Sequence, residues 1–228
     1  MENMAMPKTL LETDQPTNAS SRESAAARRR RDRDVRESEI LEAAFSEFAA
    51  RGYAATRMED VARRAGVAKG LPNFYFASKD ALFKAVLRRL ILPDWSALET
   101  RFAKSDRATA KLLCEFIGLI YERLVDNPRA HQLLRLLIAE GPRLPELTEF
   151  YHAEVIERAI ALLGSLLARG VERGEIRPGS YARYPQVIMA PALMAVLWNL
   201  LFVTDHPLDR AGFLEAHLDL ILNGLAPR

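Results

Sequence analysis

A glycine at position 66 separates two short helical patterns, and this feature constrains the fold more than any other in the chain. The first pattern opens with Thr56-Arg57-Met58-Glu59, which has the Thr-x-x-Glu form of a capping box. The second covers residues 68–74. Two short helices joined at a glycine are typical of a helix-turn-helix, whose second helix lies in the major groove of DNA.

Two further helices are expected to frame this hairpin. Residues 35–50 carry an apolar stripe at helical spacing, and Gly52 follows where a left-handed cap would need it. Ser78 is expected to cap a fourth helix that ends before Pro93. We therefore place a helix-turn-helix domain with its connecting helix at residues 35–92.

The charge of the hairpin favours a nucleic-acid partner. Residues 61–79 contain Arg63, Arg64, Lys69 and Lys79 and no acidic residue. Neutralising phosphates requires such a local excess of positive charge. The same pattern would also suit an ordinary helical hairpin with a solvated basic face.

The block resembles the N-terminal domain of TetR-family transcriptional repressors over about fifty residues. The matching residues are Ile40, Ala43, Ala44, Phe48, Gly52, Tyr53, Thr56, Asp60, Val61, Ala62, Ala65, Gly66, Val67, Lys69, Gly70, Tyr75, Phe76, Ser78, Lys79 and Leu82. The resemblance implies a DNA-binding N-terminal domain, a helical ligand-binding C-terminal domain and a homodimer paired through its last two helices.

One segment departs from the family pattern. After Lys69-Gly70 the family commonly has threonine, an aliphatic residue, tyrosine and often histidine, but this chain has Leu71-Pro72-Asn73-Phe74. Proline is tolerated only in the first turn of a helix. We therefore expect a recognition helix that starts close to Leu71 or is unusually short.

The predicted DNA-binding residues follow from the hairpin and the resemblance. The full set is Thr56, Arg57, Ala68, Lys69, Gly70, Leu71, Asn73, Phe74, Tyr75 and Lys79. Thr56 is expected to cap its helix and present that helix's N-terminus to a phosphate. By the family pattern, Arg57, Lys69, Tyr75 and Lys79 contact phosphates. Leu71, Asn73 and Phe74 are placed to meet base edges.

Composition indicates an all-α protein. Of the 228 residues 49% are hydrophobic, which is enough for a substantial core, and helical periodicity recurs throughout.

Cys114 is the only cysteine, which excludes an internal disulfide and fits a cytoplasmic location. We find no apolar signal segment at the N-terminus, no phosphate-binding loop and no metal-ligand spacing among the four histidines. No enzymatic activity, metal or cofactor is therefore expected.

Residues 1–34 are rich in polar and charged residues and are predicted to be a disordered basic arm. Four arginines, Arg28 to Arg31, stand directly before the first predicted helix. They either reach DNA phosphates or the minor groove beside the hairpin, or belong to a solvated tail.

Residues 93–228 are expected to form a ligand-binding and dimerisation bundle, giving about nine helices in the whole chain. The predicted helices cover residues 109–125, 128–140, 145–170, 180–203 with a break at Pro191, and 209–222. Residues 187–203 are apolar except for Asn199. Because Pro191 lies inside this short stretch, a buried helix is favoured over a membrane span. Pairing the last two helices with their copies would cover their second apolar face; burial within one subunit is the alternative.

A ligand pocket between the helices of this bundle is also expected. Candidate lining residues are Trp95, Phe116, Tyr121, Arg135, Tyr151, His152, Met189, Met194, Trp198 and Asn199. The abundance of leucine, methionine and aromatic residues favours an apolar ligand.

The sequence thus predicts a homodimeric repressor that a small molecule releases from a palindromic operator in double-stranded DNA. A helical ligand-binding or adaptor protein with a degenerate helix-turn-helix is the alternative, and the unusual residues 71–74 support it.

Overall fold

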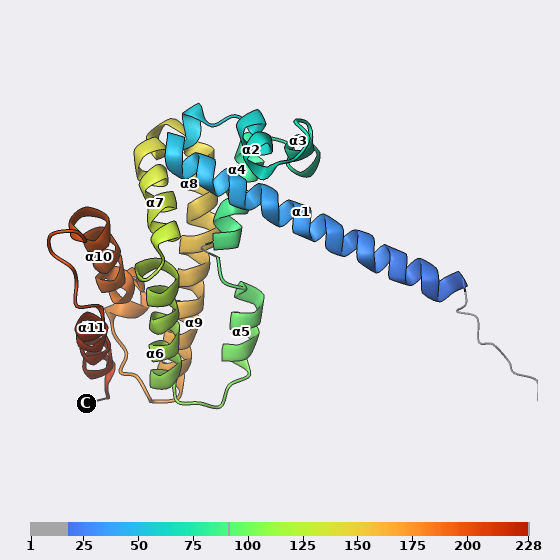
Figure 1. Ribbon diagram of the computed structural model, residues 1–228. Helices are drawn as coiled ribbons and strands as arrows, with labels where there is room; N and C mark the ends of the chain where they lie inside the picture. The colour runs from blue at the N-terminus through green and yellow to red at the C-terminus, as the bar shows by residue number, and fades with distance from the viewer. Residues whose placement is uncertain (1–17, 91, 228) are drawn as a thin grey trace, which may run out of the picture. The chain divides into compact units, whose positions relative to one another are not determined.

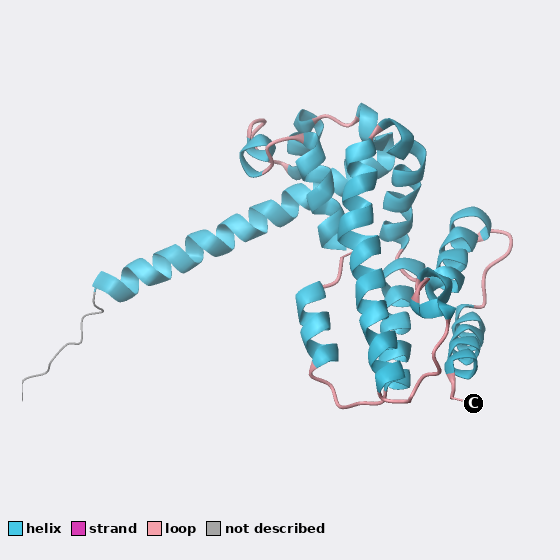
Figure 2. Cartoon of the chain, turned by 180° about the vertical axis from the view of Figure 1, so that it is seen from behind, coloured by secondary structure: helices cyan, strands magenta, loops and turns pink. Residues whose placement is uncertain are grey.

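The computed structural model describes residues 18–90 and 92–227. The chain divides into two units, residues 1–39 and 40–228, which are considered separately. Figure 2 shows that the described residues are helical, with loops between the helices and no strand.

The described part of the first unit, residues 18–39, is helical and belongs to α1 (Asn18–Ala55). The expected disorder of residues 18–34 is therefore wrong, while residues 1–17 lie outside the described residues. Alanine, arginine and glutamate all have high helix propensity, and an ion pair of 2.7 Å between Arg36 and Glu39 adds local support. The low hydrophobicity that suggested disorder does not oppose an exposed helix.

The second unit contains the remaining helices (Figure 1). After α1 they are α2 (Met58–Ala65), α3 (Leu71–Tyr75), α4 (Lys79–Leu90), α5 (Trp95–Ala103), α6 (Thr109–Ile120), α7 (Pro128–Glu140), α8 (Pro145–Tyr151), α9 (Arg158–Glu172), α10 (Gln186–Phe202) and α11 (Arg210–Leu225). Two π-helical segments, η1 (Tyr121–Val125) and η3 (His152–Glu157), continue α6 and join α8 to α9. Two 3-10 turns, η2 (Gly141–Arg143) and η4 (Ser180–Ala182), lie between helices.

Several helices begin where the sequence predicts. Pro128 and Pro145 each open a helix, and the side chain of Asn127 accepts hydrogen bonds from the amides of Arg129 and Ala130. Ser78 accepts a bond of 3.1 Å from the amide of Ala81, which confirms the expected cap of α4. Proline at a first helical position costs nothing, because its missing N–H would have no partner there anyway.

Other boundaries differ from the prediction. Counting α8, η3 and α9 as one continuous helix, the described residues form ten helices, and the additional one is α5. The helix expected over residues 180–203 begins only at Gln186 and continues through Pro191, and Ser180 lies in the separate turn η4. The helix α11, expected to end at residue 222, continues to Leu225.

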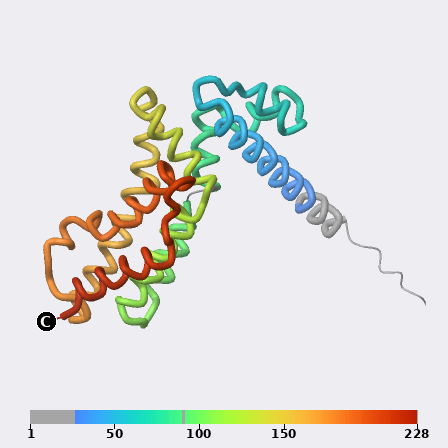
Figure 3. Tube along the Cα trace, turned by 60° about the vertical axis from the view of Figure 1, so that its left-hand side comes forward, coloured from blue at the N-terminus to red at the C-terminus, as the bar shows by residue number. Residues whose placement is uncertain are grey.

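The C-terminal bundle is built around α6 and α9, which pack against one another, with α5 on α9 and α10 and α11 in contact at the outside (Figure 3). Phe116, Ile117, Leu163 and Leu167 are buried completely between the helices. No described helix is long and apolar enough to cross a membrane.

One face of α10 remains exposed although it is strongly apolar. Leu201 is 70% exposed and Leu193 is 60% exposed. The other exposed large apolar residues of α10 and its end are Val187, Met194, Leu197, Trp198, Phe202 and Val203. Soluble monomers rarely expose so many neighbouring apolar side chains, so this face has the character of an interface.

Candidate nucleic-acid interface and ligand cavity

The turn between α2 and α3 has the geometry that the sequence predicts. Gly66 ends α2 in the left-handed conformation, with φ 66° and ψ 29°. Its amide donates to the carbonyl of Arg63 at 3.2 Å, and the amide of Val67 donates to the carbonyl of Ala62 at 3.0 Å. These bonds satisfy the last carbonyls of α2 and fix the direction in which the chain leaves it.

The recognition helix α3 is only five residues long and starts at Leu71, which confirms the expectation drawn from Pro72. Pro72 lies in its first turn and is buried, and its carbonyl accepts a bond of 2.9 Å from Phe76. Asn73 is exposed, and Phe74 is 76% exposed. Pro72 therefore anchors α3 on the domain while Asn73 and Phe74 face solvent.

The predicted capping role of Thr56 is wrong. The residue at the N-cap of α2 is Arg57, and no side chain caps this end of the helix. The hydroxyl of Thr56 is buried and donates to the carbonyl of Gly52 at 2.8 Å. The hydroxyl is therefore bonded to the end of α1 and not to the first turn of α2.

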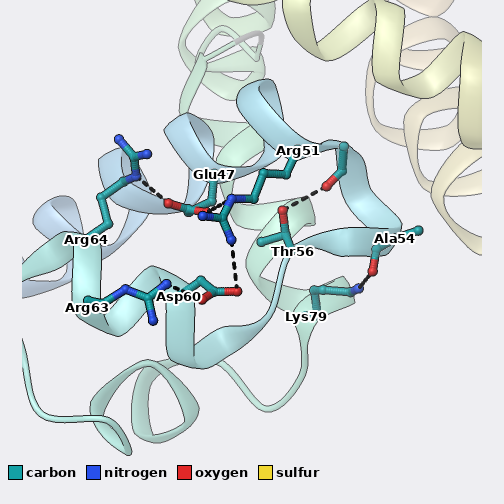
Figure 4. Close-up of polar contacts among 9 residues, drawn as sticks. Glu47, Arg51, Ala54, Thr56, Asp60, Arg63, Arg64 and Lys79 are labelled. Atoms are coloured by element: carbon teal, nitrogen blue, oxygen red, sulfur yellow. Dashed lines mark hydrogen bonds and ion pairs between the residues drawn. The ribbon is translucent and has the colours of Figure 1, made fainter.

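The cationic candidates lie in different environments. Arg57 is exposed, and Lys69 is exposed beside Glu59, with 2.9 Å between Nζ and Oε1. Lys79 instead donates to the carbonyl of Tyr53 at 2.9 Å and to that of Ala54 at 3.3 Å. Figure 4 shows the contact with Ala54. Burial lowers the pKa of Lys79. Lys79 thus caps the end of α1.

The remaining candidates lie in α3 or in the turn before it. Ala68 and Gly70 are exposed in the turn before it, whereas Leu71 and Tyr75 are half-buried against the core. Leu71, Asn73 and Phe74, the three predicted base-reading residues, therefore differ in exposure, and Asn73 and Phe74 are the more accessible pair.

A polar network that the sequence did not predict joins α1 to α2 (Figure 4). Glu47 is only 3% exposed, and its carboxylate accepts a bond of 2.6 Å from Nε of Arg64. Nε of Arg51 lies 3.3 Å from the other oxygen. Across the network, Arg63 donates to Asp60 and holds the pKa of that carboxyl below its usual value. The burial of Glu47 could have been predicted from the sequence, because Glu47 lies on the apolar stripe of its helix.

A cavity of about 50 Å³ lies inside the C-terminal bundle. Of the ten residues predicted to line a ligand pocket, Trp95, Phe116 and Met189 border it. Tyr121 is buried, with its hydroxyl 3.1 Å from Nδ1 of His217. Asn199 donates to the carbonyl of Val125 at 3.1 Å, so its amide has a partner within the subunit.

The other predicted pocket residues lie away from this cavity. Arg135 donates to the carbonyl of Leu200 at 2.8 Å, and His152 is exposed, 3.5 Å from Glu157. Burial raises the pKa of Tyr151 to about 12. Met194 and Trp198 belong to the exposed face of α10, and Trp198 donates to the carbonyl of His206 at 2.7 Å. The structure thus brings three of the ten together, and it adds Arg123, which sequence reasoning missed.

Comparison with known proteins agrees with this architecture. The family described as "Bacterial regulatory proteins, tetR family" matches residues 40–86, and "Tetracyclin repressor-like, C-terminal domain" matches residues 112–220. The HTH-type transcriptional regulator BetI of Burkholderia mallei is 31% identical over 197 residues, which cover 86% of this chain and 96% of BetI. The chain belongs to the TetR family. This assignment confirms the resemblance found in the hairpin and extends it to the bundle.

Other known proteins match over shorter stretches or in fold alone. The regulator RutR of Escherichia coli K12 is 37% identical over 141 residues, which cover 61% of this chain and 63% of RutR, less than two thirds of that protein. The crystal structure of native NalD, a repressor of the MexAB-OprM efflux pump in Pseudomonas aeruginosa, has a TM-score of 0.69 at 24% identity and covers 85% of this chain and 98% of its own. Bacillus subtilis FadR, solved with stearoyl-CoA, has a TM-score of 0.62 at 20% identity, with coverages of 82% and 98%.

Proposed function

We propose that the protein is a homodimeric transcriptional repressor that binds a palindromic operator through α3 and leaves it when a small ligand enters the C-terminal bundle. Residues 35–92 form the DNA-binding part and residues 93–228 the regulatory part. The observation that carries the proposal is the exposure of Asn73 and Phe74 on a helix anchored from below by Pro72.

The chemistry of α3 suits base readout. An asparagine amide can pair with the N6 and N7 atoms of adenine, and an aromatic ring can contact the methyl group of thymine. Arg57 at the start of α2 and Lys69 just before α3 are exposed, so they can reach phosphates, and Lys69 would then exchange its partner Glu59 for a phosphate. The family membership supports the same use of the hairpin.

The exposed apolar face of α10 supports the dimer. Two copies paired through α10 and α11 would remove this face from water and place two recognition helices on one duplex. Half-sites one turn apart require a separation of about 34–36 Å between the helices. A ligand that favours another separation would release the DNA. The free energy by which it weakens DNA binding cannot exceed the difference between its binding free energies for the two arrangements.

The function is tested by titrating the purified full chain against a duplex selected by it from a random pool and against a shuffled duplex. The expected result is a preference of at least a hundredfold for the selected duplex, which has two-fold symmetry and binds one dimer. Equal affinity for both duplexes would contradict the proposed repressor function and favour the alternative, an adaptor protein.

A further inference from the structure

The cavity in the bundle is apolar except for one side chain. Trp95 of α5, Phe116 of α6, Val155 of η3 and Met189 of α10 contribute apolar surface to its wall. Arg123, from the π-helical segment η1, is the charged residue among the described residues that border it. A cavity of this composition can accommodate a ligand with an apolar body and one polar end.

Arg123 is placed there without a protein partner. Its side chain is half-buried, and its Nε atom is removed from solvent with no hydrogen-bond acceptor among the described residues. No ion pair joins it to a carboxylate in the described part of the chain. Other arginines of the bundle are paired, such as Arg158 with Glu99 and Arg210 with Asp126. A buried donor left unbonded is unfavourable, so the position of Arg123 suits a partner that the chain does not supply.

We propose that the effector is a small monocarboxylate with an apolar body, whose carboxylate pairs with the guanidinium of Arg123 and whose body lies against Trp95 and Phe116. A carboxylate fits the planar fork of arginine with two parallel hydrogen bonds. This inference names the ligand class of the proposed repressor and therefore rests on that function.

The size of the cavity adds a requirement. At about 50 Å³ it is smaller than the roughly 300–1,000 Å³ of typical ligand sites, so binding must widen it. Both π-helical segments border it, through Arg123 and Leu124 of η1 and Val155 and Ile156 of η3. Such segments are often found at functional sites in helices. Widening at η1 would act on α7, which starts three residues after η1 ends and contacts α4.

The test is calorimetric titration of the full chain with butyrate, hexanoate and octanoate, with hexan-1-ol and hexylamine as neutral and cationic probes of matched length. Hexanoate is expected to bind at least tenfold more tightly than hexan-1-ol or hexylamine. Arg123→Gln should weaken carboxylate binding by about ten- to a hundredfold, the usual effect of losing a charge-assisted hydrogen bond. Arg143→Gln, which changes an exposed arginine outside the cavity, should leave binding unchanged.

Three outcomes overturn the inference: no carboxylate binds, the alcohol or amine binds as well as hexanoate, or Arg123→Gln binds like the unmodified chain. If Arg123→Gln does not fold, the comparison of hexanoate with its two matched probes on the unmodified chain decides. Calorimetry requires no DNA, so a failure of the ligand inference can be distinguished from a failure of the repressor function. The repressor function would fail if the ligand-free protein did not prefer its selected duplex.

Discussion

The hydroxyl of Tyr121 lies 3.1 Å from Nδ1 of His217, and Nε2 of the same imidazole lies 2.9 Å from the carbonyl oxygen of Ile188. A carbonyl can only accept, so Nε2 carries the proton and Nδ1 accepts from the tyrosine. The neutral imidazole thereby joins the end of α6 to both α10 and α11, the two helices of the proposed dimer interface.

Tyr121→Phe should therefore destabilise the protein. The change removes one hydrogen bond and leaves the buried Nδ1 atom without a donor, at a cost of about 1–2 kcal/mol in the free energy of unfolding. Urea denaturation measures this cost. Tyr184→Phe is the matched control, because Tyr184 is exposed and should tolerate the change. Equal stability of the two variants would contradict the role assigned to the bond.

Stability should also fall on acidification. Burial lowers the pKa of His217 and of His131 below 6.5, so below pH 6.5 the unfolded chain binds more protons than the folded one. The free energy of unfolding should thus decrease as pH falls from about 6.5, by up to about 1.4 kcal/mol per pH unit for each histidine.

The variant His217→Gln separates the two histidines. Its free energy of unfolding between pH 7 and pH 5 should have a shallower slope than that of the unmodified chain, with the remaining slope due to His131. An unchanged slope would show that His217 does not titrate in this range.

Two glycines should respond in opposite ways to alanine. A Cβ atom at Gly66 or at Gly118 would meet no other atom within 4 Å, so sterics cannot distinguish them. Gly66 has a positive φ, and Gly66→Ala should cost about 1–2 kcal/mol. Gly118 lies inside α6, and Gly118→Ala should stabilise by about 0.5–1 kcal/mol. Thermal unfolding of both variants gives the sign of each change in stability. Stabilisation by Gly66→Ala would contradict the turn geometry.

The proposed dimer depends on α10. Leu201→Glu introduces a charge into its exposed apolar face and should convert the dimer to a monomer at micromolar concentration, because burying an unpaired carboxylate is costly. Ile138→Glu is the control, since Ile138 is similarly exposed but belongs to α7. Sedimentation equilibrium reports the mass of each variant. A dimeric Leu201→Glu, or an unmodified chain that is monomeric, would rule out this interface.

Much of the fold could be predicted because the boundary signals are local. Pro128, Pro145 and Ser78 act through their own backbone or the next turn, and Gly66 needs only its own conformational freedom. The capping role predicted for Thr56 was wrong because its hydroxyl donates to the carbonyl of Gly52, a partner that is revealed only by the path of the chain.

The remaining differences reflect weak or absent local signals. The helix α5 is nine residues long, and its buried residues, Trp95, Leu98 and Phe102, span barely two turns. The π-helical segments have no sequence signature, so the placement of Arg123 at the cavity could not be foreseen. Among the residues predicted to contact DNA, Asn73 and Phe74 are exposed, as base readout would require, whereas the burial of Thr56 and the bonds of Lys79 to carbonyls depend on tertiary packing.

The central claim is that α3 reads DNA, and the most direct measurement is the affinity of Asn73→Ala and Phe74→Ala for the selected duplex by fluorescence anisotropy. Both side chains are exposed, so unfolding free energies should stay within about 0.5 kcal/mol of the unmodified chain. Each variant should bind the selected duplex about ten- to a hundredfold more weakly, while affinity for the shuffled duplex and its salt dependence stay unchanged. Folded variants that bind the selected duplex as tightly as the unmodified chain would contradict the account.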